Sequence, residues 1–293
     1  MIQTSMSMTE IAVKFSRKRS KTRFIKGLAM GTLGFCTSFA VDGSGFGREW
    51  LEVVELDLAI PNLPPQFEGK RIVHISDLHC GRTVSKKYLQ GCIERINQLE
   101  PDIIVLTGDY VTYDTHGRFQ SKVAQLLGGL HSSLGVYACL GNHDYGKHRL
   151  KRNYSPQEFV KGLHHSNVRV LRNQAMALKI RREKLWLVGL GDLLCDDCDP
   201  HKAFATVPSD AATITLVHNP EAVDYLEHVA AETIMCGHTH GAKMEGANPT
   251  RKHRFRAGLF DVKGKKLYVN RGLGRLGRPR FNCRPEITVY TLS

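Results

Sequence analysis

The chain of 293 residues is organised around the stretch Thr233-Ile234-Met235-Cys236-Gly237-His238-Thr239-His240-Gly241. An apolar run that stops at glycine predicts a buried strand that opens into a loop. His238 and His240 are two residues apart, so on extended backbone their rings share one face. Neutral imidazole is the commonest metal ligand in proteins, and the pattern therefore indicates a metal site at a strand end. Two surface histidines would give the same pattern.

Four more apolar runs end in polar residues. The runs and their polar ends are 70–76 with Asp77 and His79, 102–107 with Asp109, 136–140 with Asn142 and His143, and 214–217 with His218. Ligands bind beyond the carboxyl ends of strands in α/β sheets, so we expect these side chains to converge. Each residue taken alone has an ordinary explanation, such as a helix cap at Asp109 or a turn residue at Asn142.

The rest of the body alternates short strands with helices. Beyond the runs above, strands are expected over 51–60, 168–171, 175–180, 185–189, 266–269 and 286–292, and helices over 88–99, 123–130, 155–163 and 220–229. Ser155-Pro156-Gln157-Glu158 predicts a capping box with proline at the first helical position. We find no internal repeat and no linker that would divide the body, so residues 46–293 are expected to form one domain.

The donor atoms define the kind of metal site. Two aspartates, one asparagine and four histidines offer oxygen and imidazole ligands without a thiolate. This set suits a pair of Mn, Fe or Zn ions rather than a structural zinc site with cysteines.

In this order and spacing, the motifs from Arg71 to Gly241 resemble the calcineurin-like metallophosphoesterases. The motifs are Asp77-Leu78-His79, Gly108-Asp109, Gly141-Asn142-His143-Asp144, Val217-His218 and Gly237-His238-Thr239-His240. The resemblance implies a four-layer α/β/β/α sandwich of two mixed sheets flanked by helices, and a metal-dependent phosphoric ester or anhydride hydrolase.

The resemblance also implies roles for single residues. Asp77, His79 and His240 would bind one metal, Asn142, His218 and His238 the other, and Asp109 both. His143 would protonate the leaving oxygen or stabilise charge at phosphorus, and Asp144 would hold its ring. The sequence departs from the family pattern at Thr112, where an acid is common, and at Gly241-Ala242-Lys243 in place of Gly-Gly-Gln. Both departures concern substrate contacts.

The N-terminal 45 residues differ in composition from the body. A dense basic block, 16–26, precedes a glycine-containing apolar stretch, 27–41, which is short for a membrane span. The order resembles an export signal with an imperfect twin-arginine pattern, since Thr22 stands where the first arginine belongs. We expect a signal or a membrane-proximal anchor; a disordered basic tail is the alternative. The formal net charge of +13 favours an anionic partner such as phosphate or a membrane surface.

The C-terminal region indicates which branch of the family the chain resembles. Arg271-Gly272-Leu273-Gly274 and Asn282-Cys283-Arg284-Pro285-Glu286 resemble the ending of YaeI/YkuE-like membrane-associated phosphodiesterases, which are related to the UDP-2,3-diacylglucosamine pyrophosphohydrolase of lipid A synthesis. The candidate substrate-binding arginines are Arg271, Arg275, Arg278 and Arg284, because Arg can fork onto phosphate. A solvated basic loop is the alternative.

We therefore expect a dimetal phosphohydrolase that acts on phosphodiester or pyrophosphate bonds of a lipid- or nucleotide-linked substrate at a membrane surface, with UDP-2,3-diacylglucosamine as the best named substrate. The alternatives are an exported general phosphodiesterase and a catalytically weak scaffold at the membrane surface. No basic patch interleaved with aromatic residues is found, so no specific nucleic-acid partner is expected.

Eight cysteines in a chain of this length do not indicate a disulfide framework. Cys80, Cys92, Cys139 and Cys236 lie in or beside apolar runs and are expected in the core. Cys195-Asp196-Asp197-Cys198 lacks a second CxxC, so a loop disulfide after export, or no special role, is expected there.

Overall fold

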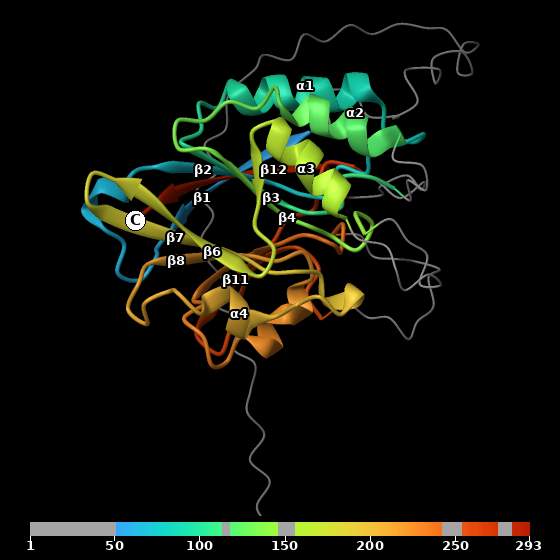
Figure 1. Ribbon diagram of the computed structural model, residues 1–293. Coiled ribbons are helices and arrows are strands. Elements are labelled where there is room, and N and C mark those ends of the chain that lie inside the picture. Colours follow the sequence, from blue (N-terminus) through green and yellow to red (C-terminus); the bar gives the residue numbers. More distant parts are fainter. Residues whose placement is uncertain (1–50, 113–117, 146–155, 242–253, 275–282) are drawn as a thin grey trace, which may run out of the picture. The chain divides into compact units, whose positions relative to one another are not determined.

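The computed structural model describes residues 51–112, 118–145, 156–241, 254–274 and 283–293. Two six-stranded sheets form the centre of this part of the chain (Figure 1). The first has the order β1-β12-β2-β3-β4-β5, with β1 at Glu52–Leu58, β2 at Arg71–Ile75, β3 at Ile103–Thr107, β4 at Val136–Cys139, β5 at Val168–Val170 and β12 at Glu286–Leu292. The strands β2 to β5 are parallel, and β12 runs antiparallel to β2.

The second sheet has the order β10-β11-β9-β8-β7-β6. Its strands are β6 at Gln174–Ile180, β7 at Glu183–Gly189, β8 at Thr213–Leu216, β9 at Thr233–Cys236, β10 at Gly258–Val262 and β11 at Lys265–Val269. The four inner strands are parallel, whereas β6 and β10 pair antiparallel at the two edges. Both sheets are thus mixed, as expected.

Helices cover the outer faces of the two sheets. The helices α1 at Lys86–Asn97, α2 at Arg118–Leu127 and α3 at Gln157–His165 share one apolar cluster with residues of the first sheet. The short helix α4 at Pro200–Phe204 and the 3-10 helix η4 at Pro220–Tyr225 share another with the second sheet. A third cluster joins the facing sides of the sheets, where Ile103 and Val105 pack with Ile214 and Leu216. The four-layer α/β/β/α sandwich is confirmed.

The central strands form because short runs rich in Val, Ile and Leu are covered on both faces. Every residue of β3, β4, β8 and β9 is buried. Parallel strands between helical layers read as continuous apolar runs for this reason. The same burial means that each strand reaches polar surroundings only where it ends, which places the polar residues after these strands along one edge of each sheet.

The structure corrects several expectations. The helix expected over 220–229 is the shorter η4, and Pro220, Val223 and Leu226 are buried at a spacing of three that fits a 3-10 turn. The elements that were not expected are α4, the edge strand β10 and two 3-10 helices, η2 at Pro65–Phe67 and η3 at Leu193–Cys195. Pro156 is the N-cap of α3 rather than its first helical residue, while Ser155 lies outside the described residues. The expected boundary near residue 45 also lies outside them and stays a prediction.

Candidate metal centre

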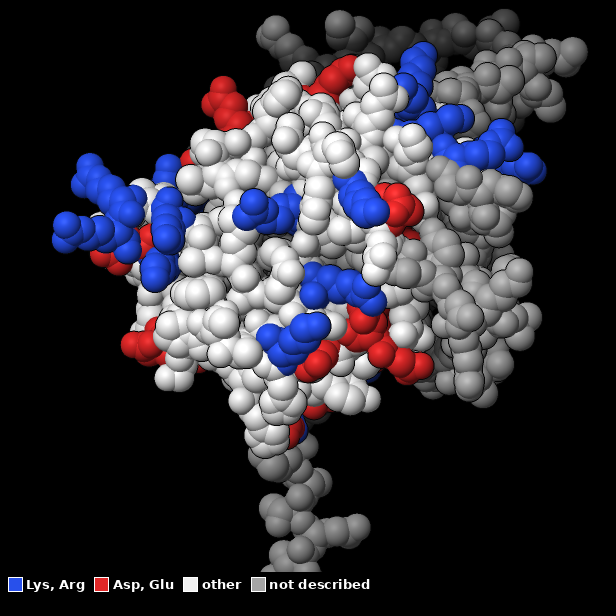
Figure 2. Space-filling view, viewed as in Figure 1, with Lys and Arg blue, Asp and Glu red and all other residues white. Residues whose placement is uncertain are grey.

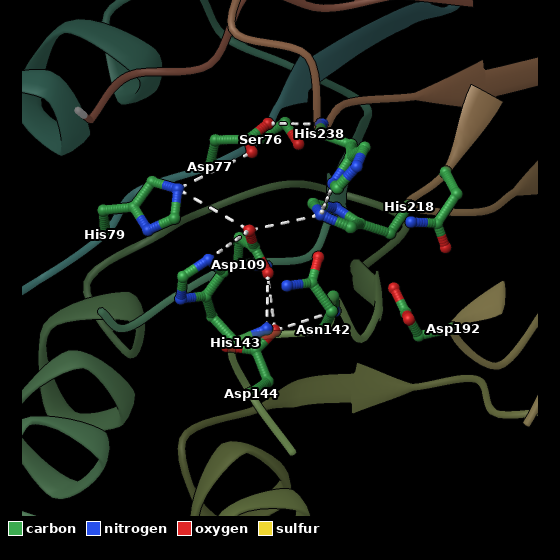
Figure 3. A network of polar contacts seen from close by, with 12 residues as sticks. Ser76, Asp77, His79, Asp109, Asn142, His143, Asp144, Asp192, His218 and His238 are labelled. Carbon is green, nitrogen blue, oxygen red and sulfur yellow. Dashed lines mark hydrogen bonds and ion pairs between the residues drawn. The ribbon is translucent and has the colours of Figure 1, made fainter. Parts of the chain in front are cut away.

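The strand ends bring the seven expected ligands together. Asp77 and His79 follow β2, Asp109 follows β3, Asn142 follows β4, His218 follows β8, and His238 and His240 follow β9. Side chains from both sheets thus meet at one edge of the sandwich, as Figure 3 shows for those that it labels. The convergence that the sequence predicts is found.

The first group is formed by Asp77, His79 and His240, whose candidate ligand atoms all lie within 4.8 Å of one another. The Nε2 atoms of His79 and His240 are 3.0 Å apart. Asp77 Oδ1 lies 3.8 Å from Nε2 of His79 and 3.4 Å from Nε2 of His240. Two imidazole nitrogens and one carboxylate oxygen therefore point at a single position.

The second group is formed by Asp109, His218 and His238, within the same 4.8 Å limit. Nδ1 of His238 lies 3.2 Å from Nε2 of His218, and that Nε2 lies 3.2 Å from Asp109 Oδ2. Nδ1 of His218 is 2.6 Å from the carbonyl oxygen of Thr107 and donates to it, which leaves Nε2 as the ligand atom. Such a hydrogen bond fixes the tautomer and direction of a metal-binding histidine.

Asp109 lies between the two groups. Its Oδ2 is 3.2 Å from Nε2 of His218 on one side and 3.6 Å from Nε2 of His79 on the other. Its other oxygen, Oδ1, accepts a hydrogen bond of 2.9 Å from the backbone N–H of His143, which holds the carboxylate in place. This is the position that a bridging carboxylate requires.

Two oxygen atoms show that the residues fit a pair of cations. Asp77 Oδ1 and Asn142 Oδ1 are buried and accept no hydrogen bond within the described part of the chain. A buried polar atom without a partner costs about 1–3 kcal/mol, so such atoms are rare unless something binds them. Each oxygen belongs to a different expected metal position, and both are hard donor atoms that suit divalent cations.

The backbone of the ligands is strained. Asp77, His79, Asp109, His238 and His240 all have φ between 47° and 75°, in the left-handed region. Asp and His tolerate this region better than most residues, but the cost is still roughly 1–3 kcal/mol each. The strain turns the side chains inward directly after each strand. The backbone before His238 also passes close to Ser76 and Asp77. Gly237 permits this close approach, because a Cβ there would overlap Ser76 Oγ and Asp77 Oδ2.

The electrostatics favour ionised carboxylates among imidazoles. Burial alone would raise the pKa of Asp77 and Asp109, but the neighbouring imidazoles, His240 and His218 foremost, outweigh it and hold both pKa values well below the ordinary range. For His218, burial opposes the charge and Asp109 overcomes it, so its pKa is raised. Burial, assisted by His218, lowers the pKa of His238 to about 4. Two buried carboxylates with histidine partners are a suitable site for cations.

His143 lies beside this centre. Its ring is nearly buried, and Nε2 is 3.9 Å from Asp109 Oδ2. Burial lowers the pKa of His143, and Asp109 offsets part of this effect. The ring also stands edge-on to His79, with centroids 5.0 Å apart. The expected acid is therefore within reach of a group bound between the two metal positions.

Asp144 has contacts other than the one expected, which was to the ring of His143. Its Oδ2 accepts from the backbone N–H groups of Asp109 and Gly141, and its Oδ1 accepts from that of Tyr110, all at 2.8 Å. Burial and the charge of Asp109 raise the pKa of Asp144, and these N–H donors offset part of the cost. Asp144 thereby ties the turn after β4 to the turn that carries Asp109.

The candidate substrate arginines are only partly described. The guanidinium of Arg271 pairs with Glu286 and, at 3.1 Å, with Glu52, so this side chain is engaged by carboxylates of the fold. Arg284 is partly exposed, and Arg275 and Arg278 lie outside the described residues. The guanidinium that was expected to bind phosphate is thus held by Glu52 and Glu286.

The cysteines follow the expectations in the main. Cys80, Cys92, Cys139 and Cys236 are buried, and Cys195 and Cys198 are free thiols. Burial raises the pKa of Cys195, and raises that of Cys198 to about 11, so both are protonated at neutral pH. The loop disulfide that the sequence allows for this pair is not found in the structure.

Sequence reasoning missed two polar residues beside the centre. Asp192 is fully buried after β7, and burial raises its pKa to about 6. Figure 3 shows it next to Asn142 and His218. Asn219 is also buried and accepts a hydrogen bond of 2.8 Å from the backbone N–H of Leu193, the residue after Asp192. A signal existed, because Asp192 follows an apolar strand just as the ligands do.

Comparisons with known proteins agree with this geometry. A family model described as calcineurin-like phosphoesterase matches residues 70–242. Phosphodiesterase YaeI of Escherichia coli (strain K12) is 32% identical, over 85% of this chain and 93% of that protein. The UDP-2,3-diacylglucosamine pyrophosphatase LpxG of Chlamydia trachomatis serovar D is 30% identical, over 82% and 88% respectively. The metallophosphoesterase YkuE of Bacillus subtilis (strain 168) is 29% identical, over 94% and 98%.

Proposed function

Because this chain belongs to the calcineurin-like phosphoesterases, which are metal-dependent hydrolases with a dimetal centre, we propose that it cleaves phosphodiester or pyrophosphate bonds of a lipid- or nucleotide-linked substrate at a membrane surface. The best named substrate is UDP-2,3-diacylglucosamine, which appears in the name of the LpxG relative.

One observation carries the hydrolase assignment. Asp109 lies between the group of Asp77, His79 and His240 and the pair His218 and His238, and the buried oxygens Asp77 Oδ1 and Asn142 Oδ1 accept no hydrogen bond from the described residues. We assign Asp77, His79 and His240 to one ion, Asn142, His218 and His238 to the other, and Asp109 to both. The oxygen and imidazole donors suit Mn, Fe or Zn.

The residues divide the chemistry between them. When bound, two divalent ions supply Lewis-acid polarisation of the phosphoryl group and activation of water. Asp109 keeps the two positions together, and its backbone is fixed by Asp144. His143 lies at the edge of the centre, where it donates a proton to the leaving oxygen or a hydrogen bond to a phosphoryl oxygen.

The membrane part of the proposal rests on sequence and relatives. The basic block 16–26 and the apolar stretch 27–41 suit a membrane-proximal leader, and the net charge of +13 suits anionic head groups. Within the residues that the structure describes, no helix is long and apolar enough to cross a bilayer. An exported phosphodiesterase is the second candidate, since the leader resembles a twin-arginine signal and YaeI is named a phosphodiesterase. A scaffold without activity is disfavoured because all seven ligands are present.

The experiment is an assay of the purified full-length chain with Mn²⁺ against UDP-2,3-diacylglucosamine in detergent and, separately, a soluble chromogenic phosphodiester. We expect release of UMP from the lipid nucleotide, and loss of both activities in Asn142→Ala. Hydrolysis of the chromogenic diester without release of UMP would support the general phosphodiesterase instead. Equal rates for the wild type and Asn142→Ala would contradict the assignment of the metal centre.

A further inference from the structure

The described part of the chain begins at the edge of the sandwich that carries the metal centre. Glu52, the first residue of β1, pairs in parallel register with Glu286 at the start of β12. Since β12 is antiparallel to β2, with Thr288 opposite His74, Glu286 lies at the end of β2 that leads to Asp77. The guanidinium of Arg271 joins Glu52 to Glu286 there. Residue 51 therefore lies at the edge of the first sheet where β2 leads to Asp77.

Four exposed cations lie at this same edge. We call Arg82, Lys86, Lys87 and Arg118 the basic rim. Arg82 belongs to the loop after β2, and the others lie in the first turns of α1 and α2, which follow β2 and β3. Among the described residues, none of the four forms an ion pair. Figure 2 shows Lys and Arg side chains gathered at the upper right, over the ends of α1 and α2.

The position of these cations is unfavourable for the helices. The N-terminus of a helix carries a partial positive charge, which acidic side chains stabilise and basic ones destabilise by about 0.3–1 kcal/mol each. The first turns of α1 and α2 contain no acidic residue. Cations held against the helix dipole at a functional edge indicate that this surface meets an anionic partner.

The first residues that the structure describes, Leu51 to Val53, lie next to the basic rim. Leu51 and Val53 line a cavity of about 110 Å³ together with Tyr88, which is in the first turns of α1. The hydroxyl of Tyr88 also donates a hydrogen bond of 3.1 Å to the carbonyl of Leu273, which follows Arg271 and Gly272. The beginning of the described chain, the basic rim and the segment beside Asp77 are thus neighbours.

We propose that the basic rim docks the metal edge of the fold onto an anionic lipid bilayer, so that the phosphate group to be cleaved is presented by the membrane itself. This inference rests on the proposed function and specifies the orientation in which it is carried out. Each Lys or Arg close to an anionic leaflet contributes about 1 kcal/mol of attraction.

The fold offers a matched control surface. The turn between β6 and β7 carries four other cations, Lys179, Arg181, Arg182 and Lys184, all exposed. Since β7 is parallel to β8, whose carboxyl end leads to His218, this turn lies at the opposite end of the second sheet. Figure 2 shows a separate gathering of Lys and Arg at the left, where Figure 1 draws the tip of these strands.

The experiment compares three full-length proteins: the wild type, a rim variant with Arg82, Lys86, Lys87 and Arg118 changed to Gln, and a turn variant with Lys179, Arg181, Arg182 and Lys184 changed to Gln. Cosedimentation measures binding to vesicles of phosphatidylcholine with 30% phosphatidylglycerol, and to pure phosphatidylcholine. A soluble chromogenic diester with Mn²⁺ measures hydrolysis separately.

We expect the rim variant to bind anionic vesicles at least tenfold more weakly than the wild type, and the turn variant within threefold of it. Equal losses in both variants, or none in the rim variant, would overturn the proposal. So would tight binding to a mixed-sequence RNA that the rim substitutions abolish while vesicle binding is unaffected. If the wild type does not hydrolyse the soluble diester, the proposed function fails while the vesicle result still decides the docking surface.

Discussion

His74 provides a quantitative test of the core beneath the metal centre. Its ring is fully buried at the end of β2, with Nε2 2.9 Å from Thr107 Oγ1 and Nδ1 3.2 Å from the hydroxyl of Tyr290. Burial lowers the pKa of His74 from 6.5 to about 3, an effect that Asp77 offsets only in part. Between pH 6.5 and about pH 3, His74 is therefore protonated in the unfolded chain and neutral in the folded chain.

The burial of neutral His74 makes the stability of the fold depend on pH. The contribution of His74 to the free energy of unfolding is fully present above pH 6.5 and decreases as the pH falls toward about 3. Between pH 7 and pH 5 the loss is about 2 kcal/mol, from the linkage of proton binding to unfolding. The variant His74→Gln keeps hydrogen-bonding atoms but does not titrate, so its free energy of unfolding should fall by about 2 kcal/mol less over the same interval.

The assay is urea unfolding at pH 7 and pH 5 for the wild type, His74→Gln and the control His131→Gln, which removes an exposed histidine. The comparison uses the pH-dependent difference, so a lower stability of His74→Gln at pH 7 does not affect it. We expect the control to follow the wild type. If the wild type and His74→Gln lose the same stability between pH 7 and pH 5, the explanation given for His74 is refuted.

Three further substitutions test the site. His143→Gln should lower the rate on a chromogenic diester by roughly 10²–10⁴, the usual contribution of a general acid, at unchanged metal content; a change below threefold would remove this role. Gly237→Ala should destabilise the fold by about 1–3 kcal/mol through overpacking, whereas Gly162→Ala, whose Cβ would make ordinary contacts on α3, should not; equal unfolding temperatures would contradict this. Asp144→Asn should lose one backbone hydrogen bond, worth about 1.5–3 kcal/mol, and weaken Mn²⁺ binding measured by calorimetry; unchanged stability and affinity would show that Asp144 does not position Asp109.

Much of the fold could be predicted because the central strands are continuous apolar runs that end abruptly. Residues 103–107 and 233–236 have no polar side chain apart from threonine, so their strand character and the polar cluster that follows are plain. Parallel strands share an edge, which makes convergence of Asp77 with Asp109 in the first sheet, and of His218 with His238 in the second, a consequence of the pattern. The meeting of the two edges depends on how the sheets pack. The pattern supplied the candidate residues, and the family resemblance supplied their expected roles as ligands.

The missed elements had local signals that periodicity does not capture. Lys263-Gly264 is a two-residue connection with φ of 53° and 82°, which joins β10 to β11 as a hairpin. Asp199 caps α4, and Pro200 is its first residue, a common helix start. The helix expected over 220–229 has a spacing of three in its apolar residues, which suits the 3-10 turn of η4 as well as an α-helix.

The contacts of Asp144 and Arg271 could not be predicted from sequence. Asp144 follows His143 directly, but the tight turn sends its carboxylate to backbone N–H groups of two different loops. Arg271 lies in a glycine-rich basic segment that suggests phosphate binding, yet its partners, Glu52 and Glu286, are distant in sequence. Such contacts depend on which strands become neighbours, and no local pattern encodes that.

The most direct test of the dimetal centre is anomalous diffraction at the manganese edge from crystals of the full-length chain grown with Mn²⁺. We predict two peaks, one among Asp77, His79 and His240 and one among Asn142, His218 and His238, with Asp109 between them. A single peak, or none within bonding distance of Asp109, would contradict the assignment.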